Sequence, residues 1–319
     1  MQDELCFPQL FNSSCRKPKL HWTKAVLLNM LMSSLSLTTV VLNLLVIISV
    51  SHFRQLHTPT NIFLLSLAVS DFFVGLLLMP VEILRNTACW LLGDIPCSFY
   101  LFVVSLLLCV SNGNIVLISI DRYQAICCPL HYSTRITTVK ARRYVFLCWL
   151  LSALSSIFYV RDNLIQPGRS KSCFGECHLT IDYVAGIIDL IINFIFSITL
   201  IVVLYMRVFV VAVSQARAMC SRVTAAKPKA KRSELKAART LGVLVVVYLI
   251  CFCPYYGYSL DEVKNSNSSF AFFLVFLFYS NSCFNPVIYA LFYSWFRKAI
   301  KLIITLQILQ PGSCETNML

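Results

Sequence analysis

Three aspartates lie inside long apolar stretches of this chain: Asp71, Asp121 and Asp189. A charged side chain at the centre of a lipid bilayer costs about 2.5–3.5 kcal/mol on insertion scales. Acids at such positions indicate a specific task, such as binding a cation, joining helices through hydrogen bonds, or holding an arginine. Their sequence neighbours indicate which of these tasks each aspartate performs.

The elements that position these acids are predicted to be membrane helices. The chain has 319 residues, of which 58% are hydrophobic and only 13% are charged, whereas soluble domains carry about a quarter charged residues. Seven apolar runs are long enough to cross a hydrocarbon core of about 30 Å. They lie near residues 26–50, 61–84, 97–124, 141–160, 181–211, 236–260 and 270–293. We therefore expect an all-α membrane protein with a seven-helix bundle, rather than a large soluble helical core.

The distribution of basic residues predicts the orientation of this bundle. With the N-terminus outside, 18 of the 27 lysines and arginines fall on the cytoplasmic side, as the positive-inside rule requires. The net charge of +13 is thus mainly a topology signal, and its spread over separate short loops argues against a nucleic acid partner. We expect an outer tail at 1–25, a transmembrane domain at 26–293, and a short amphipathic helix with a cytoplasmic tail at 294–319.

The predicted outer segments carry features of an oxidising compartment. They contain six cysteines: Cys6, Cys15, Cys89, Cys97, Cys173 and Cys177. An even number indicates three disulfides, although six cysteines allow 15 pairings. Asn12 and Asn267 each begin an Asn-Ser-Ser sequence, which is the acceptor pattern for N-glycosylation.

Asp71 is expected to belong to a buried polar cluster. It lies in the middle of the second span, and Asn43 lies at similar depth on the first. The seventh span contributes Asn281, Ser282, Asn285, Pro286 and Tyr289. Such a cluster can hold water or a sodium ion, or it can simply join the helices through hydrogen bonds. The Asn-Pro break on the seventh span favours a movable switch.

The sequence Asp121-Arg122-Tyr123 ends the third span at its cytoplasmic side. Arg122 can pair with Asp121, or it can reach Glu234, which is the one acid between Arg207 and Arg239. A bridge from the third to the sixth span would restrain an inactive state. The alternative is an anchoring charge at the membrane boundary.

Motifs on successive spans carry a family resemblance. They are Asn43, Asp71, Asp121-Arg122-Tyr123, Trp149, Pro254 and Asn285-Pro286-Val287-Ile288-Tyr289. In this order they resemble the signatures of rhodopsin-like G-protein-coupled receptors. The resemblance implies a receptor rather than an enzyme, with no cofactor, and with membrane lipid and a heterotrimeric G protein as partners.

Two stretches resemble a narrower family, the trace amine-associated receptors. They are residues 51–61 and residues 281–286 together with 293–298. The resemblance implies a Cys97–Cys177 disulfide. It also implies that Cys173 pairs with the N-terminal tail, and Cys6–Cys173 with Cys15–Cys89 is the favoured arrangement. The rival arrangement contains Cys15–Cys173.

The usual amine anchor of such receptors is absent. Amine receptors place an aspartate on the third span 18 residues before the arginine of Asp-Arg-Tyr, where this chain has Val104, and no acid lies between Cys97 and Ile120. Asp189 lies 16 residues before Tyr205 on the fifth span, or about 24 Å along a helix. This places Asp189 at ligand depth, and the chain resembles a fish-type clade with its amine anchor on the fifth helix.

Other side chains are expected to complete the amine pocket. The candidates are Val104, Ser105, Leu108, Asn193, Phe252, Tyr255, Tyr256 and Tyr279. Aromatic rings around an ammonium contribute cation–π attraction of about 0.5–2 kcal/mol, although any single ring is more often core packing. Four acids are expected at the rim, where they hold the distal amine of a diamine or are merely solvated: Glu82, Asp182, Asp261 and Glu262.

The predicted function is that of an olfactory amine receptor at the cell membrane, signalling through a stimulatory G protein to cAMP. An alternative is a rhodopsin-like receptor for a non-amine ligand, with Asp189 structural. A transporter would show inverted repeats, and none is visible. Light sensing is disfavoured because Tyr279 stands where opsins have the lysine that binds retinal.

Overall fold

The computed structural model describes residues 5–9, 13–16, 22–129, 131–132, 136–165, 173–177, 183–221, 228–259 and 268–318. Within these ranges the chain is helical, and its extended pairing is limited to two isolated bridges, Leu5 with Arg16 and Ser14 with Phe174. The predicted all-α fold is therefore confirmed.

Each apolar run lies in a helical segment. The first four spans are α1 (Trp22–His52), α2 (Pro59–Phe73) continued by α3 (Met79–Thr87), α4 (Asp94–Cys127) and α6 (Thr138–Ile165). The last three are α7 (Tyr183–Asp189) continued by α8 (Ser197–Ser221), α9 (Pro228–Ser259) and α10 (Ser268–Phe292). Local signals set some of these ends: Thr58 caps α2 by accepting from the backbone amide of Asn61 at 3.4 Å, and Pro59 occupies its first turn, where a missing N–H costs nothing.

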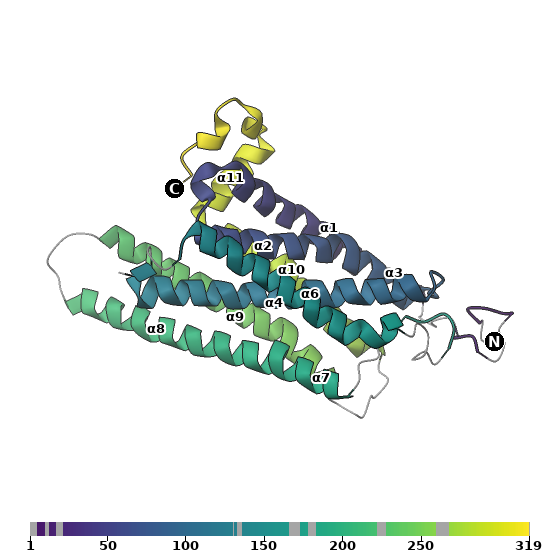
Figure 1. Ribbon diagram of the computed structural model, residues 1–319. Helices are drawn as coiled ribbons and strands as arrows, with labels where there is room; N and C mark the ends of the chain where they lie inside the picture. The colour runs from purple at the N-terminus through teal and green to yellow at the C-terminus, as the bar shows by residue number, and fades with distance from the viewer. Residues whose placement is uncertain are drawn as a thin grey trace.

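The helices form one elongated bundle with the two termini at opposite ends (Figure 1). Helix α4 is central, since it packs against α2, α6 and α8, while α10 packs against α1 and α9. We call the end that carries Cys97 and Cys177 the N-terminal face. The end that carries Arg122 is the opposite face.

The outer surface of the bundle is apolar. Leu37 on α1 is 66% exposed, and Leu151 on α6 is 61% exposed. The same holds on the fifth span, where Phe196 is 62% exposed. Such side chains would be costly in water over so large an area, whereas lipid tails solvate them. The chain is a multi-pass membrane protein.

In the part of the chain that the structure describes, two wide π-helical turns interrupt the α-helices. The first, η2 (Val74–Leu78), joins α2 to α3. A side chain at Gly75 in this turn would meet Thr39 of α1 at 3.0 Å, so glycine permits a close approach. The second, η3 (Leu190–Phe196), begins directly after Asp189. Turns of this kind often occur at functional sites.

Three disulfides close the N-terminal face. The predicted Cys97–Cys177 bond is confirmed. The favoured pairing of Cys6 with Cys173 and Cys15 with Cys89 is wrong, because the structure pairs Cys6 with Cys89 and Cys15 with Cys173. The rival pairing of Cys15 with Cys173 is thus confirmed, and Cys6–Cys89 is a pairing that the sequence analysis did not single out.

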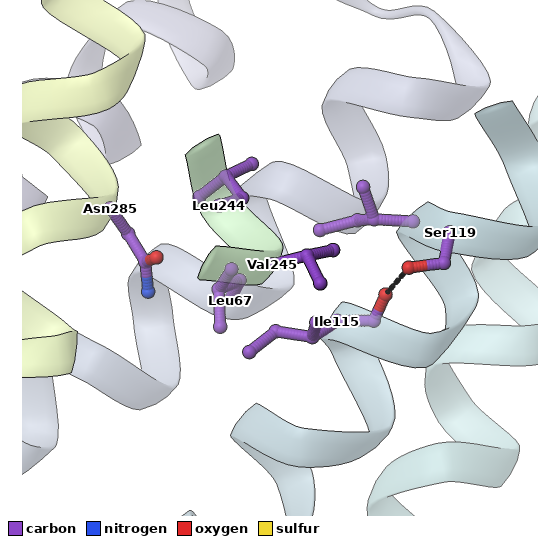
Figure 2. Close-up of a pocket in the computed structure, with 7 residues that line it drawn as sticks. Leu67, Ile115, Ser119, Leu244, Val245 and Asn285 are labelled. Carbon is purple, nitrogen blue, oxygen red and sulfur yellow. Dashed lines mark hydrogen bonds between the residues drawn. The ribbon is translucent and has the colours of Figure 1, made fainter. Parts of the chain in front are cut away.

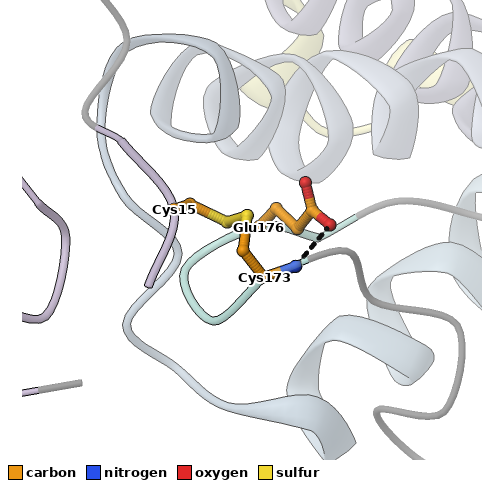
Figure 3. Close-up of side chains that lie close together, drawn as sticks. All are labelled: Cys15, Cys173 and Glu176. Carbon is orange, nitrogen blue, oxygen red and sulfur yellow. Dashed lines mark hydrogen bonds between the residues drawn. A yellow bond between two sulfur atoms is a disulfide. The ribbon is translucent and has the colours of Figure 1, made fainter. Parts of the chain in front are cut away.

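The backbone explains this pairing. The amide of Cys15 donates to the Phe174 carbonyl at 2.8 Å, and the amide of Phe174 donates to the Ser13 carbonyl at 2.7 Å, which places Cys15 beside Cys173. Glu176 accepts from the amide of Cys173 at 3.4 Å and closes the loop (Figure 3). Although Cys15, Cys173 and Glu176 lie close together, the two sulfurs are bonded to each other and offer no thiolate to a metal.

The short amphipathic helix predicted after the seventh span is α11 (Ser294–Ile304). Trp295, Phe296 and Ala299 are buried, whereas Arg297 and Lys298 are exposed. The following chain folds back against η1 (Arg54–Leu56) through short turns, η4 (Gln307–Leu309) and η5 (Ser313–Glu315). This tail and α11 lie at the end of the bundle away from the N-terminus (Figure 1).

Candidate amine site and switch regions

Asp189 is a half-buried carboxylate at the junction of α7 and η3. Its Oδ1 accepts a hydrogen bond from Asn193 Nδ2 at 2.8 Å. The same Asn193 amide lies 3.4 Å from the hydroxyl of Tyr159 on α6. Within the described ranges, no lysine or arginine forms an ion pair with Asp189. The carboxylate is thus oriented by a neutral amide and can accept a cation.

Aromatic side chains from α9 and α10 gather near η3. Phe194 of η3 stacks on Tyr256 of α9, with ring centroids 4.1 Å apart. Tyr255 and Phe252 both pack on Phe278 of α10, each at 4.8 Å. Helix α9 therefore brings together three of the predicted pocket residues, Phe252, Tyr255 and Tyr256.

The remaining predicted pocket residues are less tightly connected to this group. Tyr279 contacts the cluster through Phe278 at 5.7 Å and is only 5% exposed. Val104 and Leu108 of α4 pack against the hydrophobic core, and Ser105 between them is half-buried. No hydrogen bond joins these three described residues to Asp189 itself.

Glu82 is not the rim acid that the sequence suggested, and this interpretation is corrected. It is 4% exposed. Its Oε1 accepts from Arg85 at 2.6 Å and from Asn86 at 2.8 Å, while its Oε2 accepts from Tyr100 at 2.9 Å. The i, i+3 spacing on α3 brings Arg85 beside Glu82. The other expected rim acids, Asp182, Asp261 and Glu262, lie outside the described residues.

Sequence reasoning missed several residues that contact the site. Asn112 on α4 donates from Nδ2 to the backbone carbonyl of Asn193, and Tyr159 and Phe194 lie next to Asn193 and Tyr256. The sequence contained one signal of these contacts, because the amide of Asn112 lies in the middle of an apolar span and needs a hydrogen-bond partner. Tyr159 and Phe194 gave no such signal, since aromatic rings are common in any apolar helix.

The polar cluster around Asp71 is present. Asn285 Nδ2 donates to Asp71 Oδ2 at 2.8 Å, and Ser111 of α4 lies 3.4 Å from Oδ1. Asn43 donates to the Ser282 carbonyl at 3.0 Å, so α1, α2, α4 and α10 meet here. Asn43 Oδ1 and the Tyr289 hydroxyl are buried and have no hydrogen-bond partner among the residues that the structure describes. Such groups fit ordered water, and the sodium ion stays a prediction.

A small, mainly apolar cavity lies beside this cluster. Figure 2 shows Leu67, Ile115, Leu244 and Asn285 around it, from α2, α4, α9 and α10. Asp189 is not part of its lining. The cavity therefore belongs to the region between the polar cluster and the opposite face, and not to the amine site.

The predicted pairing of Arg122 with Asp121 is confirmed at the opposite face. Arg122 Nε donates to Asp121 Oδ2 at 2.9 Å, and Thr60 of α2 donates to the same oxygen at 2.8 Å. Tyr132 donates to Oδ1 at 2.8 Å. Burial, followed by the negative charge of Asp121, raises the pKa of the Tyr132 hydroxyl, so this hydroxyl stays protonated as a donor.

Two further predicted residues of these regions have a place in the structure. Tyr123 is half-buried and packs against Ile126 and Val208, and Pro286 lies inside α10. Glu234 lies in α9, but its side chain is outside the described residues, as are the acceptors Asn12 and Asn267. The Arg122–Glu234 bridge and both glycosylation sites therefore stay predictions.

Comparison with known proteins agrees with this architecture. Residues 42–289 match the family described as 7 transmembrane receptor (rhodopsin family). The chain is 37% identical to trace amine-associated receptor 13c of Danio rerio, over 99% of this chain and 96% of that receptor. It is 35% identical to trace amine-associated receptor 5 of Rattus norvegicus over 88% and 86%. It is 32% identical to trace amine-associated receptor 1 of Macaca mulatta over 97% and 96%. The chain thus belongs to the trace amine-associated receptors, within the rhodopsin family of G-protein-coupled receptors.

Proposed function

We propose that this receptor lies in the cell membrane with its N-terminus outside and responds to extracellular amines. The ammonium group of the ligand pairs with Asp189. The aromatic side chains of α9 surround the rest of the ligand. The names of its relatives support amines as the ligand class, and the distribution of lysines and arginines supports the orientation.

One observation carries the proposal. Asp189 is half-buried, its carboxylate is oriented by Asn193 at 2.8 Å, and no described cation neutralises it. A buried carboxylate without a counter-ion is costly. A charge-assisted hydrogen bond to an ammonium removes much of that cost. Glu82, by comparison, already has Arg85 as its cation.

The test is an amine dose response on Asp189→Asn, a nearly isosteric change that removes the charge and leaves one oxygen to accept from Asn193. Truncating one partner of a buried charge pair costs about 2–5 kcal/mol, which predicts a loss of potency of at least about 30-fold. Asp189→Glu is the charge-retaining control and should keep a measurable amine response. Alcohols with the same carbon skeleton should be inactive on the wild type. An unchanged amine potency in Asp189→Asn would contradict the anchor.

The proposed downstream partner is a heterotrimeric G protein of the stimulatory or olfactory class, with cAMP as the second messenger. The bundle has two states, and amine binding shifts the equilibrium between them only by the difference in the affinity of the amine for the two states. A panel of G-protein dissociation sensors, read beside cAMP, tests the class. Coupling to another class without any cAMP response would contradict it.

A second candidate is a receptor for a neutral or acidic ligand in which Asp189 is structural. The hydrogen bond from Asn193 favours it, because a structural acid would be held in the same way. A ligand screen that includes neutral and acidic odorants beside amines separates the two, since only the amine receptor loses its response in Asp189→Asn.

We also expect monoamines to be favoured over diamines, because Glu82, the one expected rim acid among the described residues, already has Arg85 as its cation. A second ammonium would have to leave water, and Glu82 cannot accept it because both oxygens are already engaged. We expect a terminal diamine to be at least about tenfold less potent than the monoamine of equal length, which corresponds to about 1.4 kcal/mol. A more potent diamine would contradict this expectation and direct attention to Asp182, Asp261 or Glu262.

A further inference from the structure

The chain after α11 returns to the loop that joins α1 to α2, at the opposite face of the bundle (Figure 1). We call residues 307–318 the clasp and residues 53–58 the α1–α2 loop. The chain reverses at Leu306, whose φ of 57° is the left-handed conformation that a side chain disfavours. Such a conformation persists only where surrounding contacts hold it. The contacts of the clasp must therefore supply this support.

Ser313 connects the clasp to the end of α1. Its hydroxyl donates to the Ile308 carbonyl at 2.6 Å. The same oxygen lies 2.9 Å from Nε2 of His52, the last residue of α1. A serine hydroxyl has one proton, so His52 donates here and Ser313 accepts. Because Ser313 begins the short turn η5, this bond fixes the turn against α1.

Two further contacts reach the α1–α2 loop itself. The backbone amide of Met318 donates to Gln55 Oε1 at 3.0 Å, and Arg54 pairs with Glu315 at 3.4 Å. Both side chains of the ion pair are largely exposed, so water weakens their attraction. The side chain of Met318, by contrast, is only 1% exposed. Burial of this apolar side chain therefore anchors the far end of the clasp.

The α1–α2 loop in turn reaches the ion pair at the opposite face. In the first turn of α2, Asn61 Nδ2 donates to the Leu56 carbonyl of the loop at 2.9 Å. Thr60, in the same turn, donates to Asp121 and accepts from Arg122. One helical turn thus joins the loop to the ion pair, so a contact that holds the loop also holds the position of Thr60.

We propose that the clasp is an autoinhibitory segment whose docking partner is the α1–α2 loop of the same chain. While it is closed, it engages Arg54 and Gln55 and keeps the first turn of α2 against the Asp121–Arg122 pair. Opening of the clasp frees the loop and lets the pair separate more readily. The effect on signalling rests on the proposed coupling to a G protein, whereas the docking itself does not.

The deciding variant is Met318→Lys, which places a charge at the buried end of the clasp. This charge would be costly to bury, and it lies near Lys298, which donates to the adjacent Asn317 carbonyl, so the clasp should open. In the purified receptor without ligand or G protein, hydrogen–deuterium exchange of residues 53–58 should become about twofold faster or more. In cells at equal surface expression, basal G-protein signalling should rise about twofold or more. Gln310→Lys adds the same charge at an exposed position of the clasp, and it should match the wild type in both measurements.

Removal of residues 307–319 is the second variant, because it eliminates the clasp without adding a charge. It should raise exchange and basal signalling at least as much as Met318→Lys does. In an Asp121→Asn background the deletion should raise basal signalling no further, because the pair that the clasp holds is already absent. Fully multiplicative effects of the deletion and Asp121→Asn would overturn the proposal, since the clasp would then act by another route.

These outcomes are separable from those of the amine anchor and of the G-protein class. Exchange is measured on the receptor alone, and basal signalling is measured without amine on a panel of G-protein sensors. Wild-type exchange in both Met318→Lys and the deletion would overturn the proposal, because the clasp would not hold the loop. Raised exchange would overturn it too if basal signalling stayed at the wild-type level in cells where Asp121→Asn raises it. The clasp would then dock without restraining activation.

Discussion

Asp189 and Glu82 show how the surroundings of a residue decide its role. Both are acids near the N-terminal face, and both were candidates for binding an amine. Arg85 lies one helical turn from Glu82, and its guanidinium pairs with the carboxylate at 2.6 Å. Arg85 also donates to the Cys177 carbonyl at 3.1 Å, so the pair supports the loop that closes the bundle. Asp189 has no such partner among the described residues, which leaves its charge for a ligand.

This difference predicts a stability phenotype for the Glu82–Arg85 pair. Removing one member of a buried ion pair costs about 3–5 kcal/mol, because the other charge is left uncompensated. Arg85→Gln and Glu82→Gln should therefore each lower the unfolding temperature of the purified receptor. The double variant should be more stable than either single one. A double variant whose loss equals the sum of both single losses would show that the two charges do not stabilise each other.

At the scale of elements, the seven spans were predictable because each is a long apolar run with few charges, and the bilayer accepts little else. Asp71 and Asn285 could also be placed together, since a buried acid needs a hydrogen-bond donor at its own depth. The turn η3 could not be foreseen, because no periodicity distinguishes one π turn within an apolar helix. The amide of Asn112 was a visible signal, but its partners Asn193 and Tyr248 depend on how three helices pack.

The disulfide pairing of the N-terminal cysteines could not be predicted from the sequence either, for a related reason. Spacing does not choose among pairings, and the choice depends on the hydrogen bonds between the tail and Phe174. Non-reducing peptide mapping by mass spectrometry should recover Cys6 linked to Cys89 and Cys15 linked to Cys173. Cys97 linked to Cys177 serves as the internal control. Recovery of a Cys6–Cys173 peptide would contradict the arrangement of the tail.

At the scale of the whole molecule, hydrogen-bonded groups extend along the bundle from one face to the other. Asp189 lies in its N-terminal part, Asn112, Asp71 and Asn285 lie near the middle, and Asp121 with Arg122 lies at the opposite face. Helix α4 contributes Asn112 and Ser111 to the middle level and Asp121 to the opposite face. A helix that packs against so many others is suited to transmit a change in one level to the next.

The ion pair between Arg122 and Asp121 at the opposite face should restrain activation of the receptor. Tyr132 donates to Asp121 at 2.8 Å and thereby helps to hold the carboxylate that pairs with Arg122. Tyr132→Phe removes a hydrogen bond to a charged group, which is worth about 1.5–3 kcal/mol. Arg122 should then leave Asp121 more readily, and basal G-protein signalling should rise about tenfold or more at equal surface expression. Asp121→Asn should raise it further, because it removes the charge itself, whereas Tyr144→Phe on α6, at a residue that is 44% exposed, should leave it unchanged. Wild-type basal signalling in both Tyr132→Phe and Asp121→Asn would mean that this ion pair anchors the helix end without restraining activation.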